Sequence, residues 1–242
     1  MITLRRAAER EHDRRRKYET WRTFPAQDRA GKLDSGFGDL EGLNESHLEP
    51  GGRVRSPSGH PAELITYVRE GTVACEDPAG RSCRIRAGEF QQMTLGRGVH
   101  PVGINPSASD SARVFQIWLH ACEDDLEPSQ EQKRFSTAQR RGMLCVIASR
   151  DGRKGSLRVH QDVLMHSALL EPGQHVVHEL SQGRRAWLHL VEGEVVLGDF
   201  ILGTGDGAGV TTDRAVSITA REVTEILLLD LREPATPAHE CA

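Results

Sequence analysis

The chain has 242 residues, a length that suits two small domains or one large β structure. Of these residues 37% are hydrophobic and 27% are charged, and the formal net charge is −4. Charges of both signs are interspersed and the pI is near 6.3, which argues against a dedicated nucleic-acid-binding protein, because such proteins carry a broad basic field. No stretch approaches the ~20 apolar residues of a membrane span, and residues 1–17 lack the apolar core of a secretory signal, so we expect a soluble, cytoplasmic protein without a membrane partner.

Short β-strand patterns rich in Val, Ile, Leu and Thr follow one another along the chain, separated by turn sequences rich in Gly, Pro, Asn and Asp. In chain order they are residues 64–76, 82–88, 113–121, 144–149, 155–171, 175–180, 186–198, 215–220 and 224–231. Few amphipathic helices intervene. This spacing predicts an all-β protein of antiparallel barrels or sandwiches and argues against a parallel α/β sheet.

The domain organisation follows from a weak internal repeat. The sequence L-E-P-G stands at 48–51 and again at 170–173, and in both halves it is followed by a strand pattern and an E-G turn. Duplication of one barrel explains this order. We therefore expect an N-terminal barrel at 1–130, a helical connector at 131–139 with Ser129 as N-cap, a C-terminal barrel at 140–232 and a flexible tail at 233–242.

Several collinear segments resemble the pirin family, which has a bicupin fold. They include ITLRRAAER at 2–10, ITYVREGTV at 65–73, AGEFQQMTLGRG at 87–98, FQIWL at 115–119 and DGRKGSLRVHQD at 151–162. The resemblance covers nearly the whole chain. It implies two antiparallel jelly-roll β-barrels packed side by side, with the N-terminal strand joining the opposite barrel.

The resemblance also implies a metal, usually iron, in the N-terminal barrel, bound by three histidines and one glutamate as in quercetin dioxygenases. Such a ligand set leaves open positions for substrate and oxygen. Counting back from the matched segments, the four family ligands fall on Pro57, Gly59, Pro101 and Gly103. None of these residues offers a side-chain donor. We therefore expect no metal cofactor, with iron or another divalent transition metal as the alternative.

Two histidines lie next to the lost positions. His60 and His100 would reach the barrel interior only if the register shifted by one residue, and such a shift turns a strand residue to the opposite face. Glu63 would then have to complete the site. Surface or rim positions are the preferred interpretation, and re-use of His60 and His100 as ligands is the alternative.

Loss of the four ligands predicts a wider, drier pocket in the N-terminal barrel, open to a small organic molecule. His60, Glu63 and His100 are the candidates for acid/base chemistry. The predicted lining is Ser56, Pro57, Ser58, Gly59, His60, Glu63, Arg97, His100, Pro101 and Gly103. The same residues can equally be solvated loops around a disused cavity.

Three functions remain open from the sequence. The preferred one is a metal-free bicupin that binds a small organic molecule and catalyses, if anything, a cofactor-independent isomerisation or cyclisation. The alternatives are a metal-dependent quercetin 2,3-dioxygenase-like oxygenase and a non-catalytic regulatory or redox-responsive protein. The five cysteines form no metal-binding motif, and most are expected to be free thiols, although Cys75 and Cys83 flank a turn that brings them close together.

Overall fold

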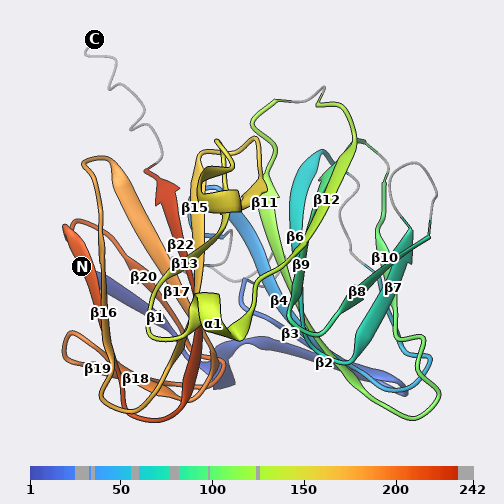
Figure 1. The fold of residues 1–242 in the computed structure, drawn as a ribbon, viewed down its shortest axis with the longest axis horizontal. Helices are drawn as coiled ribbons and strands as arrows, with labels where there is room; N and C mark the ends of the chain where they lie inside the picture. The colour runs from blue at the N-terminus through green and yellow to red at the C-terminus, as the bar shows by residue number, and fades with distance from the viewer. Residues whose placement is uncertain are drawn as a thin grey trace.

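The computed structural model describes residues 1–24, 33, 36–55, 60–76, 82–97, 99–123 and 126–233. Within these residues the chain forms two antiparallel β-barrels that lie side by side (Figure 1). The predicted all-β bicupin fold is thus confirmed. No helix in the described part of the chain is long and apolar enough to cross a membrane.

The N-terminal barrel consists of a seven-stranded sheet in the order β12-β9-β6-β11-β4-β3-β2 and a four-stranded sheet in the order β5-β10-β7-β8. The strands are β2 Glu11–Arg15, β3 Tyr18–Arg22, β4 Leu40–Leu48, β5 Arg53–Arg55, β6 Ala62–Glu70, β7 Thr72–Glu76, β8 Ser82–Arg86, β9 Glu89–Leu95, β10 Val102–Ile104, β11 Ala112–His120 and β12 Ser129–Arg134.

The C-terminal barrel repeats this arrangement, with a seven-stranded sheet in the order β1-β20-β17-β22-β15-β13-β14 and a four-stranded sheet in the order β16-β21-β18-β19. The strands are β1 Ile2–Arg5, β13 Cys145–Ser149, β14 Leu157–Arg158, β15 Val163–Leu170, β16 His175–Glu179, β17 Arg184–Glu192, β18 Glu194–Leu197, β19 Phe200–Gly203, β20 Gly207–Val210, β21 Ala215–Ala220 and β22 Thr224–Arg232. Helix α1 Thr137–Arg140 and two short 3-10 helices, η1 Ala7–Glu9 and η2 Arg153–Gly155, complete the elements.

The N-terminal strand β1 crosses to the C-terminal barrel, as expected. It pairs with β20, from Ile2 opposite Val210 to Arg5 opposite Gly207 (Figure 1). The N-terminal barrel, predicted to span residues 1–130, therefore begins at β2. The crossing covers the edge of the C-terminal seven-stranded sheet.

The predicted helical connector at 131–139 is wrong in its first half. Residues 129–134 form β12, which pairs with β9 along its whole length. Helix α1 covers only Thr137–Arg140, and its N-cap is Ser136, whose hydroxyl accepts from the Gln139 backbone N–H, instead of Ser129. Polar β12 has no apolar stripe to bury as a helix, whereas pairing with β9 satisfies its backbone. The tail at 234–242 lies outside the described residues.

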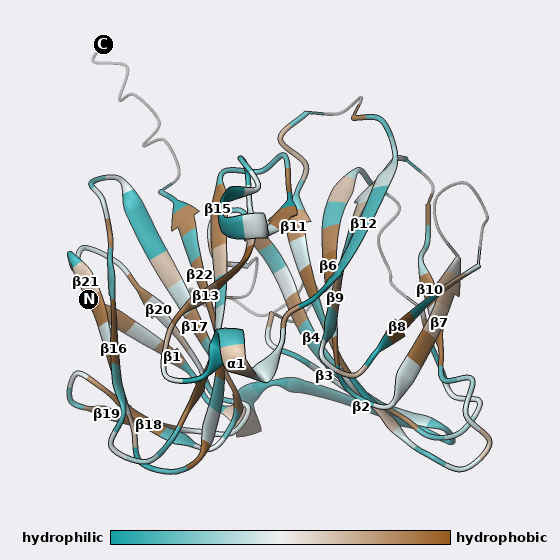
Figure 2. Cartoon of the chain, viewed as in Figure 1, coloured by the Kyte–Doolittle hydropathy of each residue, from teal (hydrophilic) through white to brown (hydrophobic). Residues whose placement is uncertain are grey.

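Hydrophobic and hydrophilic residues alternate along many of the strands of both barrels (Figure 2). The largest buried cluster contains side chains from both barrels, among them Tyr67 and Phe115 of the first and Trp187 and Leu227 of the second. Separate clusters fill the interiors of the C-terminal and N-terminal barrels. Burial of this shared face makes the two barrels one packed unit.

Candidate functional site

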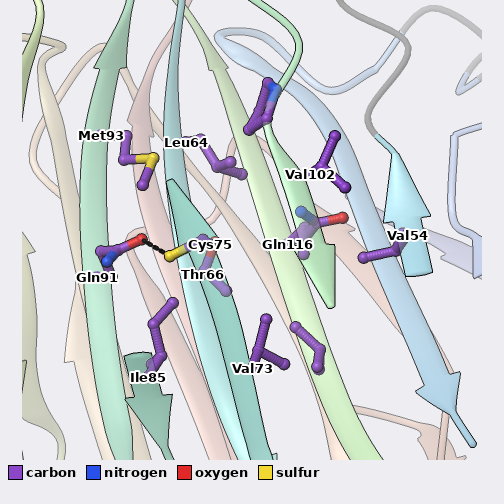
Figure 3. A pocket seen from close by; sticks show the side chains of 13 residues that line it. Val54, Leu64, Thr66, Val73, Cys75, Ile85, Gln91, Met93, Val102 and Gln116 are labelled. Carbon is purple, nitrogen blue, oxygen red and sulfur yellow. Dashed lines mark hydrogen bonds between the residues drawn. The ribbon is translucent and has the colours of Figure 1, made fainter. Parts of the chain in front are cut away.

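A small cavity lies inside the N-terminal barrel, where the family pattern places its site. Its volume, measured as the space open to the centre of a water molecule, is about 20 Å³. The lining residues are Val54, Leu64, Thr66, Val73, Cys75, Ile85, Gln91, Met93, Pro101, Val102, Gly103, Val114 and Gln116 (Figure 3). A space of this size holds about one water molecule. The walls of the cavity are mainly apolar, as expected. The expected wide cavity is not observed, since the space is narrow.

Valine side chains explain why the cavity is narrow. A Cβ atom built on Gly103 would lie 3.0 Å from Val73 Cγ1 and 3.2 Å from Val54 Cγ1. The space left by the absent glutamate side chain is thus already occupied by these two valines. Gly103 also belongs to strand β10, paired with Val54, and is not the loop residue expected from the sequence.

The strand β6 decides which predicted residues face the cavity. Leu64 and Thr66 line it. Glu63, which precedes Leu64 on the strand, points to the opposite face, toward the seam between the barrels. The Glu63 carboxylate is fully buried and accepts hydrogen bonds from the backbone N–H groups of His160, at 2.8 and 3.0 Å, and Gln161, at 2.7 Å. Glu63 is therefore a structural contact between the barrels, and its predicted place in the pocket is wrong. His160 takes part in this junction through its main chain.

The remaining predicted site residues are dispersed. Pro101 and Gly103 line the cavity, whereas His60, Arg97 and His100 are exposed to solvent. The predicted pocket residues Ser56, Pro57, Ser58 and Gly59 lie outside the described residues. The structure therefore does not bring His60, Glu63 and His100 together.

Two strands place a disulfide at the cavity wall. Cys75 of β7 and Cys83 of β8 are directly opposite in the antiparallel pair, with Cα atoms 5.1 Å apart, and their sulfur atoms are bonded. Cys75 lines the cavity, and its sulfur lies 3.6 Å from Gln91 Oε1 (Figure 3). The expected proximity of Cys75 and Cys83 across the turn is confirmed, and Cys122 and Cys145 are free thiols, as expected for most of the cysteines.

Buried charges join the barrels at the seam. Arg140 donates to Glu225 Oε1 at 2.8 Å, and the Tyr67 hydroxyl donates to the same oxygen. Burial and the nearby Glu225 carboxylate raise the pKa of Tyr67 well above its usual value. The Tyr67 side chain lies on the seam side of β6, where it meets Arg140 and Glu225. The three side chains therefore connect the two barrels and do not reach the cavity.

A second buried network lies around Glu45. Its carboxylate is paired with Arg10 at 2.9 Å and with Arg113 at 2.7 Å. Burial alone would raise the pKa of Glu45, but the hydrogen bond from His47 and the charges of Arg113 and Arg10 hold it well below its usual range. Neither network can be recognised in the sequence, because the oppositely charged partners in each are 35 or more residues apart.

The comparisons with known proteins agree with this architecture. The pirin family model matches residues 5–119, and the model for the quercetinase C-terminal cupin domain matches residues 146–231. A quercetin 2,3-dioxygenase of Escherichia coli (strain K12) is 34% identical over 231 residues, which are 96% of this chain and 99% of that protein. The chain belongs to the pirin family.

Solved structures of bacterial pirins superpose closely on this pirin. The crystal structure of YhhW from Escherichia coli has a TM-score of 0.88 at 33% identity and covers 98% of this chain and 100% of its own. A YhhW structure in complex with nickel(II) has a TM-score of 0.86 at 33% identity and covers 96% of this chain and 100% of its own. YhaK from the same organism has a TM-score of 0.75 at 25% identity and covers 88% of this chain and 93% of its own.

The cavity of this pirin does not fit a transition metal held as the family pattern implies. Among the described lining residues, the polar side chains are those of Thr66, Gln91, Gln116 and the disulfide-bonded Cys75, without an imidazole or carboxylate. Divalent transition metals in proteins are bound by imidazole, carboxylate and thiolate groups. At 57, 59, 101 and 103 the sequence supplies only Pro and Gly.

One group of metal-ligand type escaped the sequence analysis. Glu41, His60 and His120 bring a carboxylate oxygen and two imidazole nitrogens within 4.8 Å of one another. The sequence pairs His60 with His100 and Glu63 as an alternative ligand set, and neither of these two residues belongs to the group. No local motif signals it, because the three residues come from three separate segments of the chain.

Proposed function

We propose that this pirin is a metal-independent binding protein whose N-terminal barrel takes a small, mainly apolar organic molecule. The observation that carries this proposal is the lining of the cavity, which is mainly apolar and contains no described imidazole or carboxylate. Sites for small organic molecules are concave and mostly apolar, with a few polar groups that orient the ligand. The hydroxyl of Thr66 and the amides of Gln91 and Gln116 are such groups.

The size of the cavity limits the class of ligand. Cavities that enclose a drug-sized molecule measure ~300–1,000 Å³, whereas the space here is about 20 Å³. A ligand enters only when flexible wall residues such as Met93 change rotamer. A single hydroxylated aromatic ring, whose hydroxyl bonds to a glutamine amide, suits this lining better than a three-ring flavonol.

Binding is better supported than acid/base catalysis. The three residues expected to transfer protons do not meet: His60 and His100 are exposed, and Glu63 faces the seam. A general acid or base has to reach the reacting group directly or through one water molecule. Nothing in the described lining meets this requirement, so we propose a binding role without a proton-transfer step.

Quercetin 2,3-dioxygenase activity is the second candidate. It is favoured by a relative of that name which is 34% identical over nearly its whole length, and by the nickel complex of a solved relative. This candidate requires a metal in the N-terminal barrel, and the described lining offers no ligands for it.

The test combines ligand binding with oxygen uptake. Purified protein is titrated with phenol, catechol and quercetin by calorimetry, in parallel with Val54→Phe, which fills the cavity, and Val73→Ala, which enlarges it. We expect the single-ring compounds to bind, Val54→Phe to abolish binding and Val73→Ala to strengthen it. Oxygen consumption with quercetin after loading with Fe²⁺ or Ni²⁺ would instead support the dioxygenase.

A further inference from the structure

A compact group of three metal-ligand side chains lies on the N-terminal barrel, outside the cavity. Glu41 Oε2 is 2.9 Å from His60 Nε2 and 3.8 Å from His120 Nδ1. All three ligand atoms lie within 4.8 Å of one another. Ligands bound to one metal ion at ~2.0–2.2 Å are separated by about 3 Å, so movements of about 1 Å bring these atoms to binding distance.

The backbone holds two of these residues in fixed positions. His120 is the last residue of β11, and it pairs with Ala62 at the start of β6. Its backbone N–H donates to Asp39 at 3.0 Å, and its carbonyl accepts from Gln161 Nε2, also at 3.0 Å. The side chain of His120 therefore projects from an anchored strand end. His60, two residues before Ala62, is brought beside it by the same pairing.

A β-bulge directs Glu41 toward the histidines. On β11 the neighbours Trp118 and Leu119 pair with Gly42 and Leu40 of β4, so Glu41 is the extra residue between them. A bulge of this kind re-aims a side chain that regular pairing would place elsewhere. Bulges of this type are features of functional sites in many sheets, and here the extra residue is the carboxylate that both imidazoles face.

We propose that Glu41, His60 and His120 form a binding site for a divalent first-row transition metal on this pirin. Two imidazoles and one carboxylate are a donor set that suits Zn²⁺, Ni²⁺ and Fe²⁺. Three protein ligands leave further positions for water or an exogenous ligand. The site is distinct from the family positions 57, 59, 101 and 103, and it uses none of the cavity-lining residues.

An ordinary surface ion pair explains the geometry less well. An exposed pair contributes only ~0–1 kcal/mol, and one imidazole is enough to make it. Here a second imidazole is directed at the same carboxylate oxygen, with side-chain exposures of 50% for His60, 48% for His120 and 27% for Glu41. This exposure leaves room for metal-bound water.

The experiment measures metal binding to the full chain. Ni²⁺ and Zn²⁺ are titrated by calorimetry, and Co²⁺ by its visible absorption, into the wild type and the variants Glu41→Gln, His60→Ala and His120→Ala. His175→Ala is the matched control, because His175 is an exposed histidine of the other barrel. We expect one equivalent in the wild type, a loss of about tenfold or more in affinity in each ligand variant, and no change in the control.

Further variants make the result decisive. If His100→Ala weakens binding as much as His60→Ala, the metal is held by the pair adjacent to the family positions and the proposal is overturned. It is also overturned if the wild type shows no saturable site, or if Glu41→Gln and His120→Ala bind like the wild type. Stoichiometric metal in a triple variant that combines Glu41→Gln, His60→Ala and His120→Ala would overturn the proposal and contradict the metal-independent binding function as well. Unchanged circular dichroism spectra confirm that each variant is folded.

Discussion

The carboxylate of Glu63 accepts a 2.7 Å hydrogen bond from the backbone N–H of Gln161, and so joins a strand of the N-terminal barrel to the segment before β15 of the C-terminal barrel. The same carboxylate accepts from the His160 N–H and from Gln92 Nε2. Since it is fully buried, the backbone N–H groups of His160 and Gln161 would be left unpaired without it, whereas Gln92 Nε2 would keep its bond to Thr94 Oγ1. Glu63 thus contributes to the association of the barrels.

We expect Glu63→Ala to lower the free energy of unfolding by about 3 kcal/mol, because buried donors lose a charged acceptor. Urea denaturation followed by tryptophan fluorescence measures this change. Glu171→Ala, at an exposed position, is the control and should change the free energy by less than about 0.5 kcal/mol. A loss of ligand binding by Glu63→Ala without a loss of stability would show that Glu63 belongs to the site after all.

Replacement of Glu225 tests the second seam network. Glu225→Leu leaves the Arg140 guanidinium buried without its carboxylate, and this should lower the free energy of unfolding by about 3–5 kcal/mol. Tyr67→Phe removes the hydrogen bond that the hydroxyl donates to Glu225 and the one that it accepts from Arg140, and it keeps the ion pair, so a loss of about 1–2 kcal/mol is expected. Equal losses in both variants, measured by urea denaturation, would argue against a dominant role for the ion pair.

Two buried histidines predict acid sensitivity. Burial, with Arg10 and Arg113 nearby, lowers the pKa of His189 to about 3, and burial with His178 lowers that of His166 to about 4. In the unfolded chain both have a pKa near 6.5. At a pH between the folded and the unfolded pKa, only the unfolded state binds the proton. The stability contributed by each neutral histidine is therefore fully present above pH 6.5 and is lost as the pH falls toward 3–4.

The expected loss between pH 7 and pH 5 is about 2 kcal/mol for each histidine. Urea denaturation at the two pH values measures it, and His189→Asn should show a smaller pH dependence than the wild type by about this amount. His175→Ala, at an exposed position of the same barrel, provides the comparison and should retain the pH dependence of the wild type. If His189→Asn and the wild type lose stability in parallel, His189 is not responsible.

The disulfide predicts a redox-dependent stability. Cys75 and Cys83 are separated by eight positions along the chain, and closing a loop of this size stabilises the folded state by about 2 kcal/mol. We expect Cys75→Ala/Cys83→Ala, or treatment with dithiothreitol, to lower the free energy of unfolding by that amount. Cys122→Ser, which removes an exposed free thiol, should have no such effect. No difference between oxidised and reduced protein would show that the pair does not stabilise the fold.

The sequence predicts the fold well because several independent patterns along the chain indicate the same architecture. Strand patterns, the L-E-P-G repeat and the family segments all indicate two barrels, and the pairing of Ile2 with Val210 agrees with the expected strand crossing. The side of β6 to which the Glu63 side chain points cannot be predicted in this way. All residues of β6 from Ala62 to Val68 are buried, so no alternation of polar and apolar residues distinguishes the cavity side from the seam side.

The metal-ligand group is beyond prediction for another reason. Glu41, His60 and His120 converge only through the pairing of three strands and one bulge, and a single extra residue decides where Glu41 points. The narrowness of the cavity likewise depends on how Val54 and Val73 pack around Gly103. Sequence patterns predict which positions are buried, but they do not predict packing at the level of single methyl groups.

Restoring the family ligands tests whether the barrel frame is intact. The substitutions Pro57→His, Gly59→His, Pro101→His and Gly103→Glu supply the pattern implied by the family. The glutamate side chain will be crowded, since a Cβ at position 103 lies 3.0 Å from Val73 and 3.2 Å from Val54. We therefore expect the quartet alone to bind Ni²⁺ weakly, and the quartet combined with Val73→Ala to bind at least about tenfold more tightly, because ligand geometry governs affinity.

Both variants are made in a His60→Ala/His120→Ala background, so that any Ni²⁺ bound belongs to the restored site. Calorimetry gives the affinity, and Val73→Ala without the quartet is the control that should bind no metal. Equal affinity with and without Val73→Ala would show that the valines do not obstruct the ligand. If neither quartet variant binds Ni²⁺ although both are folded, the segments at 56–63 and 97–103 no longer hold the family's ligand geometry, and loss of the metal centre extends from the side chains to the backbone.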